Sequence, residues 1–264
     1  MAGVGAGVAG VVVTGNGAAD CAEYNILLMV TLALETVTPA GSLAIWRDGQ
    51  VIAETGDTTT PHAARLPMAL VDFLAAQGLA LTDVGRLAVV CGPGSFTGVR
   101  IGMACVQGLA VTRGLDVAAV STLEAIAEGW RVGTPDAPPQ TVVACLDGMR
   151  GEVFTAVFMW DGQVMRSVGV AVVGVPSPDV VEGLAGPVSV VGSGAVRYAD
   201  VWRAAGVDTV RDALEPLAAS AARLASSPAW PVTSPHALRP VYVRRPDVEL
   251  ARERRALEGQ TPDQ

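Results

Sequence analysis

The chain has 264 residues, half of them apolar, and a formal net charge of -8 at pH 7. This length and apolar content suit one large domain or two smaller ones with buried cores. The negative charge repels polyanions, so any contact with nucleic acid has to be local or shared with a partner. All eighteen residues counted as Lys or Arg are arginine, which excludes P-loop ATPases and Schiff-base enzymes because both need a lysine.

The first part of the chain, residues 1–28, is rich in glycine, alanine and valine and contains no lysine or arginine. A secretory signal starts with positive charge, so we expect either a disordered leader or a mis-assigned start, with Met29 as the true one. The longest apolar run, residues 26–34, is about half the length that crosses a bilayer. A cytoplasmic protein without membrane contact is expected.

The segment after Met29 predicts three short strands, and the same pattern occurs a second time. In the first copy Asp48-Gly49 is typical of a two-residue hairpin turn. The hexamer WRDGQV at 46–51 corresponds to MWDGQV at 159–164, and matching first strands end in Glu35 and Asp147. An internal repeat is therefore predicted, with strands over residues 29–35, 42–46 and 50–55 and again over 141–147, 152–160 and 163–173.

Each strand trio is followed by alternating helices and strands, which indicates parallel pairing and helices that cover a sheet. In the second copy the first helical segment is expected at 178–186 and the last at 213–225. The predicted class is therefore α/β, with two lobes that each contain a mixed sheet. The expected organisation is a leader over 1–28, lobes over 29–132 and 141–238, a linker over 133–140 and a tail over 239–264.

A glycine-rich loop, GPGSFTGVR at 92–100, connects a predicted strand to a predicted helix. Free backbone N–H groups at such a place bind anions, but Ser95 or Thr97 can cap the helix and satisfy the same donors. The spacing fits neither G-x-G-x-x-G nor G-x-S-x-G. The pattern therefore favours a closely packed turn, with an anion site as the alternative.

Few residues carry catalytic chemistry. Glu35 and Asp147 either face each other as an acid and base or a magnesium site, or serve only the ends of their strands. With Gly94, Ser95 and Gly192 they form a candidate vestigial nucleotide or anion cleft. A histidine pair on one helical face is absent, since Leu66 stands four residues after His62. No metal ligand and no cofactor are assigned.

The predicted helix over 61–77 carries two apolar stripes at helical spacing. One comprises Leu66, Ala69, Leu70, Phe73 and Leu74, and the other Met68, Val71 and Ala75. One stripe can face the sheet, and the other needs a second surface. That surface is either another part of this chain or a partner protein.

Four stretches resemble the bacterial TsaB (YeaZ) family of tRNA threonylcarbamoyladenosine (t6A) biosynthesis. They are LALETVTPAGSLAIWRDG, GPGSFTGVRIGMACVQGLA, LDGMRGEVF and RPVYVR, and the resemblance runs from about Met29 to Arg245. The resemblance implies a duplicated actin-like and Hsp70-like ATPase (ASKHA) fold. It also implies a non-catalytic subunit that binds and activates the paralogous transferase TsaD. Many relatives have Asp where this chain has Glu35, which leaves nucleotide binding open.

The family pairs with TsaD through the first two helices of the N-terminal half, which implies a heterodimer, with a TsaE-like ATPase at the junction and tRNA contact only through the complex. The interface residues expected here are Leu66, Leu70, Val71, Arg100, Met103, Val106 and Ala110. The free chain is a candidate homodimer.

Two other functions stay open at this point. One is an enzyme of the actin-like class, either an ATP-dependent phosphotransferase or a hydrolase like the M22 metallopeptidases. The other is direct tRNA binding by the arginine-rich tail.

Overall fold

The computed structural model describes residues 29–56, 62–162, 165–213 and 215–244. Its first sheet has the strand order β3-β2-β1-β4-β5. Strand β1 lies in the middle, antiparallel to β2 and parallel to β4, and every one of its residues is buried. The strands are β1 (Val30–Glu35), β2 (Ser42–Arg47), β3 (Gln50–Thr55), β4 (Val84–Val90) and β5 (Val117–Val120).

The second sheet repeats this topology. Its order, β10-β9-β6-β7-β8, is the first order read from the other edge, and β6 is antiparallel to β7 and parallel to β9, as β1 is to β2 and β4. The repeat predicted from the sequence is thus confirmed at the level of strand order. The strands are β6 (Gln140–Asp147), β7 (Val153–Trp160), β8 (Met165–Gly174), β9 (Val188–Val191) and β10 (Thr209–Arg211).

The turn between β2 and β3 has the predicted hairpin geometry. Asp48 and Gly49 have φ values of 53° and 79°, and a two-residue turn with both central residues at positive φ matches the twist of the flanking strands. The hairpin aligns Arg47 with Gln50 and Trp46 with Val51. The local Asp-Gly signal therefore sets the register of this pair.

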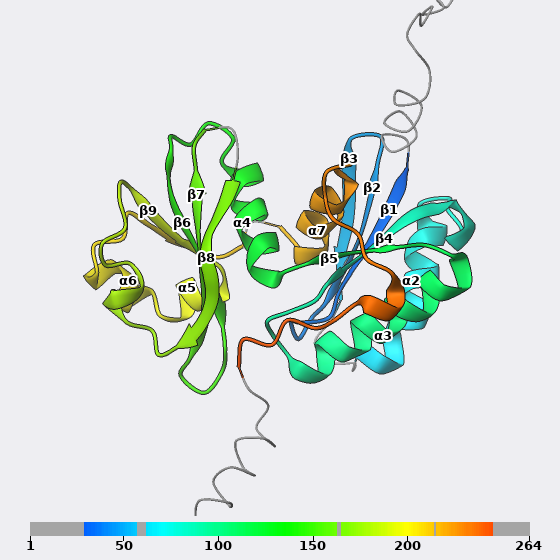
Figure 1. Cartoon of the computed structure of the whole chain (residues 1–264), viewed down its shortest axis with the longest axis horizontal. Coiled ribbons are helices and arrows are strands. Elements are labelled where there is room, and N and C mark those ends of the chain that lie inside the picture. The colour runs from blue at the N-terminus through cyan, green and yellow to red at the C-terminus, as the bar shows by residue number, and fades with distance from the viewer. Residues whose placement is uncertain (1–28, 57–61, 163–164, 214, 245–264) are drawn as a thin grey trace, which may run out of the picture.

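Helices cover both sheets (Figure 1). Helices α2 (His62–Ala76) and α3 (Phe96–Arg113) lie on the outer side of the first sheet, and the short α5 (Ser193–Arg197) and α6 (Ala199–Ala204) on the outer side of the second. Helices α4 (Thr122–Gly133) and α7 (Leu217–Ser226) lie between the sheets and contact each other. The 3-10 turns are η1 (Leu81–Asp83), η2 (Pro178–Val180) and η3 (Pro235–Ala237).

Each of the two central helices packs on the sheet that the other half of the chain forms. Helix α4 follows the first sheet but contacts β6, whereas α7 follows the second sheet but contacts β1, β2 and β4. Six alanine and serine residues of α7 are buried, and small side chains allow this close approach. The lobe boundaries expected from the sequence stay predictions, and they do not include this exchange of helices.

One element differs from the sequence prediction, and another begins later. The helical segment expected at 178–186 is only the turn η2, because Gly183 and Gly186 adopt positive φ values of 74° and 72° and end a right-handed helix. Helix α7 begins at Leu217 rather than 213, with Pro216 as its N-cap. The predicted leader and most of the predicted tail lie outside the described residues.

Candidate functional site

The glycine loop is a tightly packed turn in the structure. A Cβ on Gly94 would lie 2.8 Å from Cβ of Val37, and one on Gly92 would lie 2.6 Å from the carbonyl oxygen of Val241. Ser95 is the N-cap of α3 and its Oγ accepts a hydrogen bond from the Gly98 N–H at 3.1 Å. The chain's own atoms therefore fill the space around the loop and satisfy one of the free donors of the helix.

The first turns of α3 lie against the residue that follows β1. The Thr36 hydroxyl donates a hydrogen bond to the carbonyl oxygen of Gly98 at 2.7 Å. A Cβ on Gly98 would lie 1.9 Å from the Thr36 carbonyl oxygen, and a Cβ on Gly102 would lie 2.3 Å from its hydroxyl. These two glycines allow helix and strand end to touch, as the close-packing interpretation of GPGSFTG predicts.

Glu35 ends β1 and is almost fully buried. Its carboxylate accepts hydrogen bonds from the Thr38 N–H at 2.7 Å, the Thr38 hydroxyl at 3.1 Å and the Ser42 hydroxyl at 2.9 Å. The Ser42 Oγ also accepts a hydrogen bond from the Ala218 N–H in the first turn of α7, at 3.2 Å. Glu35 is thus held by a polar network that ties the β1–β2 turn to α7.

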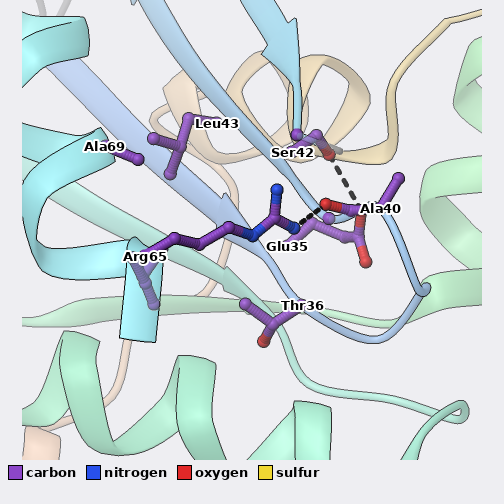
Figure 2. Close-up of a pocket in the computed structure, with 10 residues that line it drawn as sticks. Glu35, Thr36, Ala40, Ser42, Leu43, Arg65 and Ala69 are labelled. Atoms are coloured by element: carbon purple, nitrogen blue, oxygen red, sulfur yellow. Dashed lines mark hydrogen bonds between the residues drawn. The ribbon is translucent and has the colours of Figure 1, made fainter. Parts of the chain in front are cut away.

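A small cavity lies beside this network (Figure 2). Arg65 reaches into it from α2 and donates a hydrogen bond to the carbonyl oxygen of Ala40. The cavity, which Glu35, Thr36 and Leu66 also line, has a volume of about 30 Å³. This space suits one or two water molecules, whereas small-molecule sites have at least roughly 300 Å³.

Burial raises the pKa of the Glu35 carboxyl, because desolvation of the charged form outweighs the hydrogen bonds from Thr38 and Ser42. The charge therefore opposes folding at neutral pH. Below about pH 4.5 the carboxyl is protonated in both states, and above it the unfolded chain releases the proton first.

We expect the free energy of unfolding of the wild type to fall, relative to that of Glu35→Gln, as the pH rises through the raised pKa of the folded state. Urea unfolding of both proteins between about pH 4 and pH 8 measures the difference. A difference that grows in favour of the wild type with rising pH would contradict the expected direction.

The second-lobe residues of the predicted cleft lie in a separate network. Asp147 ends β6, accepts a hydrogen bond from the Met149 N–H at 3.0 Å and lies 3.5 Å from the Arg197 guanidinium. Gly192 precedes α5, and a Cβ there would lie 2.4 Å from the Cys145 carbonyl oxygen. Among the described contacts none joins Asp147 to Glu35. A joint acid–base or nucleotide site for them stays a prediction.

The structure separates the seven predicted interface residues into two groups. Five are buried within the chain's own core, and their place in a partner interface stays a prediction: Leu66, Leu70, Met103, Val106 and Ala110. Val71 is 56% exposed, and Arg100 is also exposed. The helical period shows that two stripes exist, but it does not show which of them faces the sheet.

The second predicted stripe of α2 is the exposed one. Met68 is 63% exposed, Val71 56%, and Ala75 is exposed as well. We call these three residues the outer stripe. It is an apolar surface that the described part of the chain leaves uncovered, whereas the sequence left open whether this chain or a partner covers it. Pro67 lies inside α2 beside it, where it removes a backbone donor.

Three further observations concern metals, thiols and membranes. In the described ranges no three His, Cys, Asp or Glu side chains are grouped as metal ligands would be. Cys91, Cys105 and Cys145 are free thiols, and burial raises the pKa of Cys145 to about 12. Within the same ranges, no helix combines the length and the apolar character that crossing a bilayer requires. The side chain of His62 lies outside the described residues.

Two sheets with one strand order, each flanked by helices, define a duplicated α/β protein of the actin-like (ASKHA) class. Among solved structures the fold is similar to YeaZ from Pseudomonas aeruginosa, with a TM-score of 0.68 and 28% sequence identity over 81% of this chain and 99% of that chain. The family model of TsaD, tRNA N6-adenosine threonylcarbamoyltransferase, matches residues 56–178.

Sequence relatives agree with the structural ones. The tRNA threonylcarbamoyladenosine biosynthesis protein TsaB of Escherichia coli is 39% identical over 147 residues, which are 53% of this chain and 62% of the relative. The match therefore covers less than two thirds of that relative. The uncharacterised protein Rv3421c of Mycobacterium tuberculosis is 32% identical over 85% of this chain and 96% of its own length. The chain belongs to the TsaB (YeaZ) family, which confirms the resemblance seen in the sequence.

Proposed function

We propose that the chain is a non-catalytic partner subunit in tRNA threonylcarbamoyladenosine biosynthesis, where it binds and activates a TsaD-type transferase. The TsaB relatives named for this pathway support the pathway. The match to the TsaD family model supports descent from a common ancestor with the transferase. In this proposal the protein is cytoplasmic, holds no cofactor of its own, and contacts a TsaE-like ATPase and tRNA only within the complex.

The observation that carries the proposal is the outer stripe on α2. An exposed Met68 and Val71 on one face of a helix form an apolar surface of the kind that protein partners cover. The helix beneath is well anchored, because Leu66, Leu70, Phe73 and Leu74 are buried. Because this helix is already ordered, binding of its apolar stripe to a second helix pair does not include the free-energy cost of ordering it.

The packing around the glycine loop supports a docking role over nucleotide chemistry. The space next to Gly98 is filled by Thr36, that next to Gly94 by Val37, and that next to Gly92 by Val241. The loop therefore positions α3 against the sheet. Its function in this proposal is to hold the docking helices in place.

The test combines light scattering after size exclusion with an assay of t6A formation on a tRNA transcript. The chain, the TsaD paralogue from the same genome and their mixture are compared. We expect a one-to-one complex in the mixture, and t6A formation at least about 100-fold faster with both proteins than with either alone, which equals roughly 2.7 kcal/mol. Transfer by this chain alone would favour the enzyme alternative, and full activity of the paralogue alone would refute an activating role. Scattering of the chain alone reports self-association.

A further inference from the structure

The segment Leu238–Arg244, which we call the strap, follows η3 and leaves the first lobe. Leu238 is buried in the main core. The Val241 N–H donates a hydrogen bond to the Cys91 carbonyl oxygen at 2.8 Å, directly after β4. The Val241 carbonyl lies against Gly92 closely enough to exclude a Cβ there. The strap therefore begins fixed to the glycine loop.

The middle of the strap is bound to the first turn of α3. The Tyr242 ring stacks on Phe96 with centroids 5.1 Å apart and an interplanar angle of 30°. The Arg100 guanidinium lies 3.8 Å from the Phe96 ring centroid, and its Nε donates a hydrogen bond to the Tyr242 hydroxyl at 3.0 Å. The stacked pair and the cation over the aromatic face both stabilise this attachment.

The end of the strap is bound to the second lobe. Arg244 forms an ion pair with Glu152 and lies 5.2 Å from the Phe154 ring centroid. Glu152 belongs to the β6–β7 turn, whose Gly148 N–H donates to the Glu152 carbonyl oxygen at 2.9 Å. A Cβ on Gly148 would lie 3.1 Å from the Arg244 Nη2, so this turn accommodates the guanidinium.

The strap therefore joins two loops from different lobes. In Figure 1 it runs from α3 toward the second sheet, below the pair α4 and α7. The contact between α4 and α7 is the central connection between the lobes. If two lobes met only at one central contact, they could rotate about it as rigid bodies. A second attachment away from that contact opposes the rotation.

We propose that the strap fixes the angle between the two lobes by tying the glycine loop and α3 of the first lobe to the β6–β7 turn of the second. Arg244 is the residue that closes this connection, and its release lets the lobes rotate about α4 and α7. The inference concerns the chain by itself and does not depend on the TsaD-type partner.

The test uses the full-length chain with Arg244→Ala. We expect the amide of Val241 and the amides of residues 148–154 to exchange hydrogen at least about tenfold faster than in the wild type, since local opening becomes easier. Small-angle X-ray scattering is expected to show a larger radius of gyration. The matched control is Arg166→Ala, which removes an ion pair to Asp161 at 3.3 Å within the second lobe and is expected to change neither measurement.

Two further variants keep the result interpretable. Tyr242→Ala removes the stacking on Phe96 and the hydrogen bond from Arg100, and it should also increase exchange at residues 148–154 through a different contact. Adding Glu152→Ala to Arg244→Ala should produce no further increase, because both substitutions remove one interaction. Folded Arg244→Ala and Tyr242→Ala proteins with wild-type exchange and wild-type scattering would overturn the proposal.

Discussion

Substituting Gly98 with alanine is expected to destabilise the protein by about 3 kcal/mol, at the upper end of what overpacking usually costs. The added Cβ would lie 1.9 Å from the backbone carbonyl oxygen of Thr36, and a backbone atom in a buried strand end has no rotamer by which to move away. The helix has to shift, which strains the hydrogen bond from the Thr36 hydroxyl to the Gly98 carbonyl. Urea unfolding monitored by circular dichroism measures the loss.

Gly108 provides the control in the same helix. A Cβ there meets no atom within 4 Å, so Gly108→Ala should gain about 0.5–1 kcal/mol from the higher helix propensity of alanine. If the two variants are equally stable, the packing of Gly98 against Thr36 does not constrain the fold. In that case the close-packing account of GPGSFTG is wrong.

The second large effect is expected at Val71 and depends on the proposed function. Val71→Glu should weaken binding to the TsaD-type partner at least about 100-fold, because an unpaired carboxylate in an apolar interface costs several kcal/mol and each 1.4 kcal/mol is tenfold in affinity. Formation of t6A should fall in parallel at protein concentrations near the wild-type Kd. Since Val71 is 56% exposed in the free chain, its stability should change by less than about 0.5 kcal/mol.

Two other substitutions to glutamate show why Val71 is the appropriate site for this test. Val170→Glu introduces the same charge at a valine that is 82% exposed on β8, and it should leave partner binding unchanged. Leu70→Glu is unsuitable as an interface test, because Leu70 is only 4% exposed and its substitution would unfold α2. Wild-type affinity of Val71→Glu would exclude the outer stripe from the interface.

The sequence was sufficient for the architecture because the relevant signals are local. The Asp48-Gly49 turn, the alternating strands and the Ser95 cap each depend on a few adjacent residues. The recurrence of the strand pattern and of the Asp-Gly pair after residue 140 predicted the second sheet. The exchange of α4 and α7 was not predicted, because helix periodicity says which face is apolar but not which sheet that face contacts.

The candidate site was predictable only in part for the same reason. Val106 and Ala110 form an apolar line on α3, but the structure buries this line. Arg100 was expected in the partner interface, and in the structure it binds Tyr242, which lies 142 residues further along the chain. A contact over such a separation leaves no pattern in a single sequence.

The crosswise packing of α4 and α7 has a consequence for how the protein melts. Each sheet is completed by a helix that the other half of the chain supplies, so neither half buries its apolar surface without the other. The two repeats should therefore unfold in one cooperative transition, with the calorimetric and van't Hoff enthalpies equal. During synthesis, the first half of the chain leaves the ribosome before α7, so one face of its sheet is exposed. That apolar face needs protection from aggregation until residues 217–226 emerge.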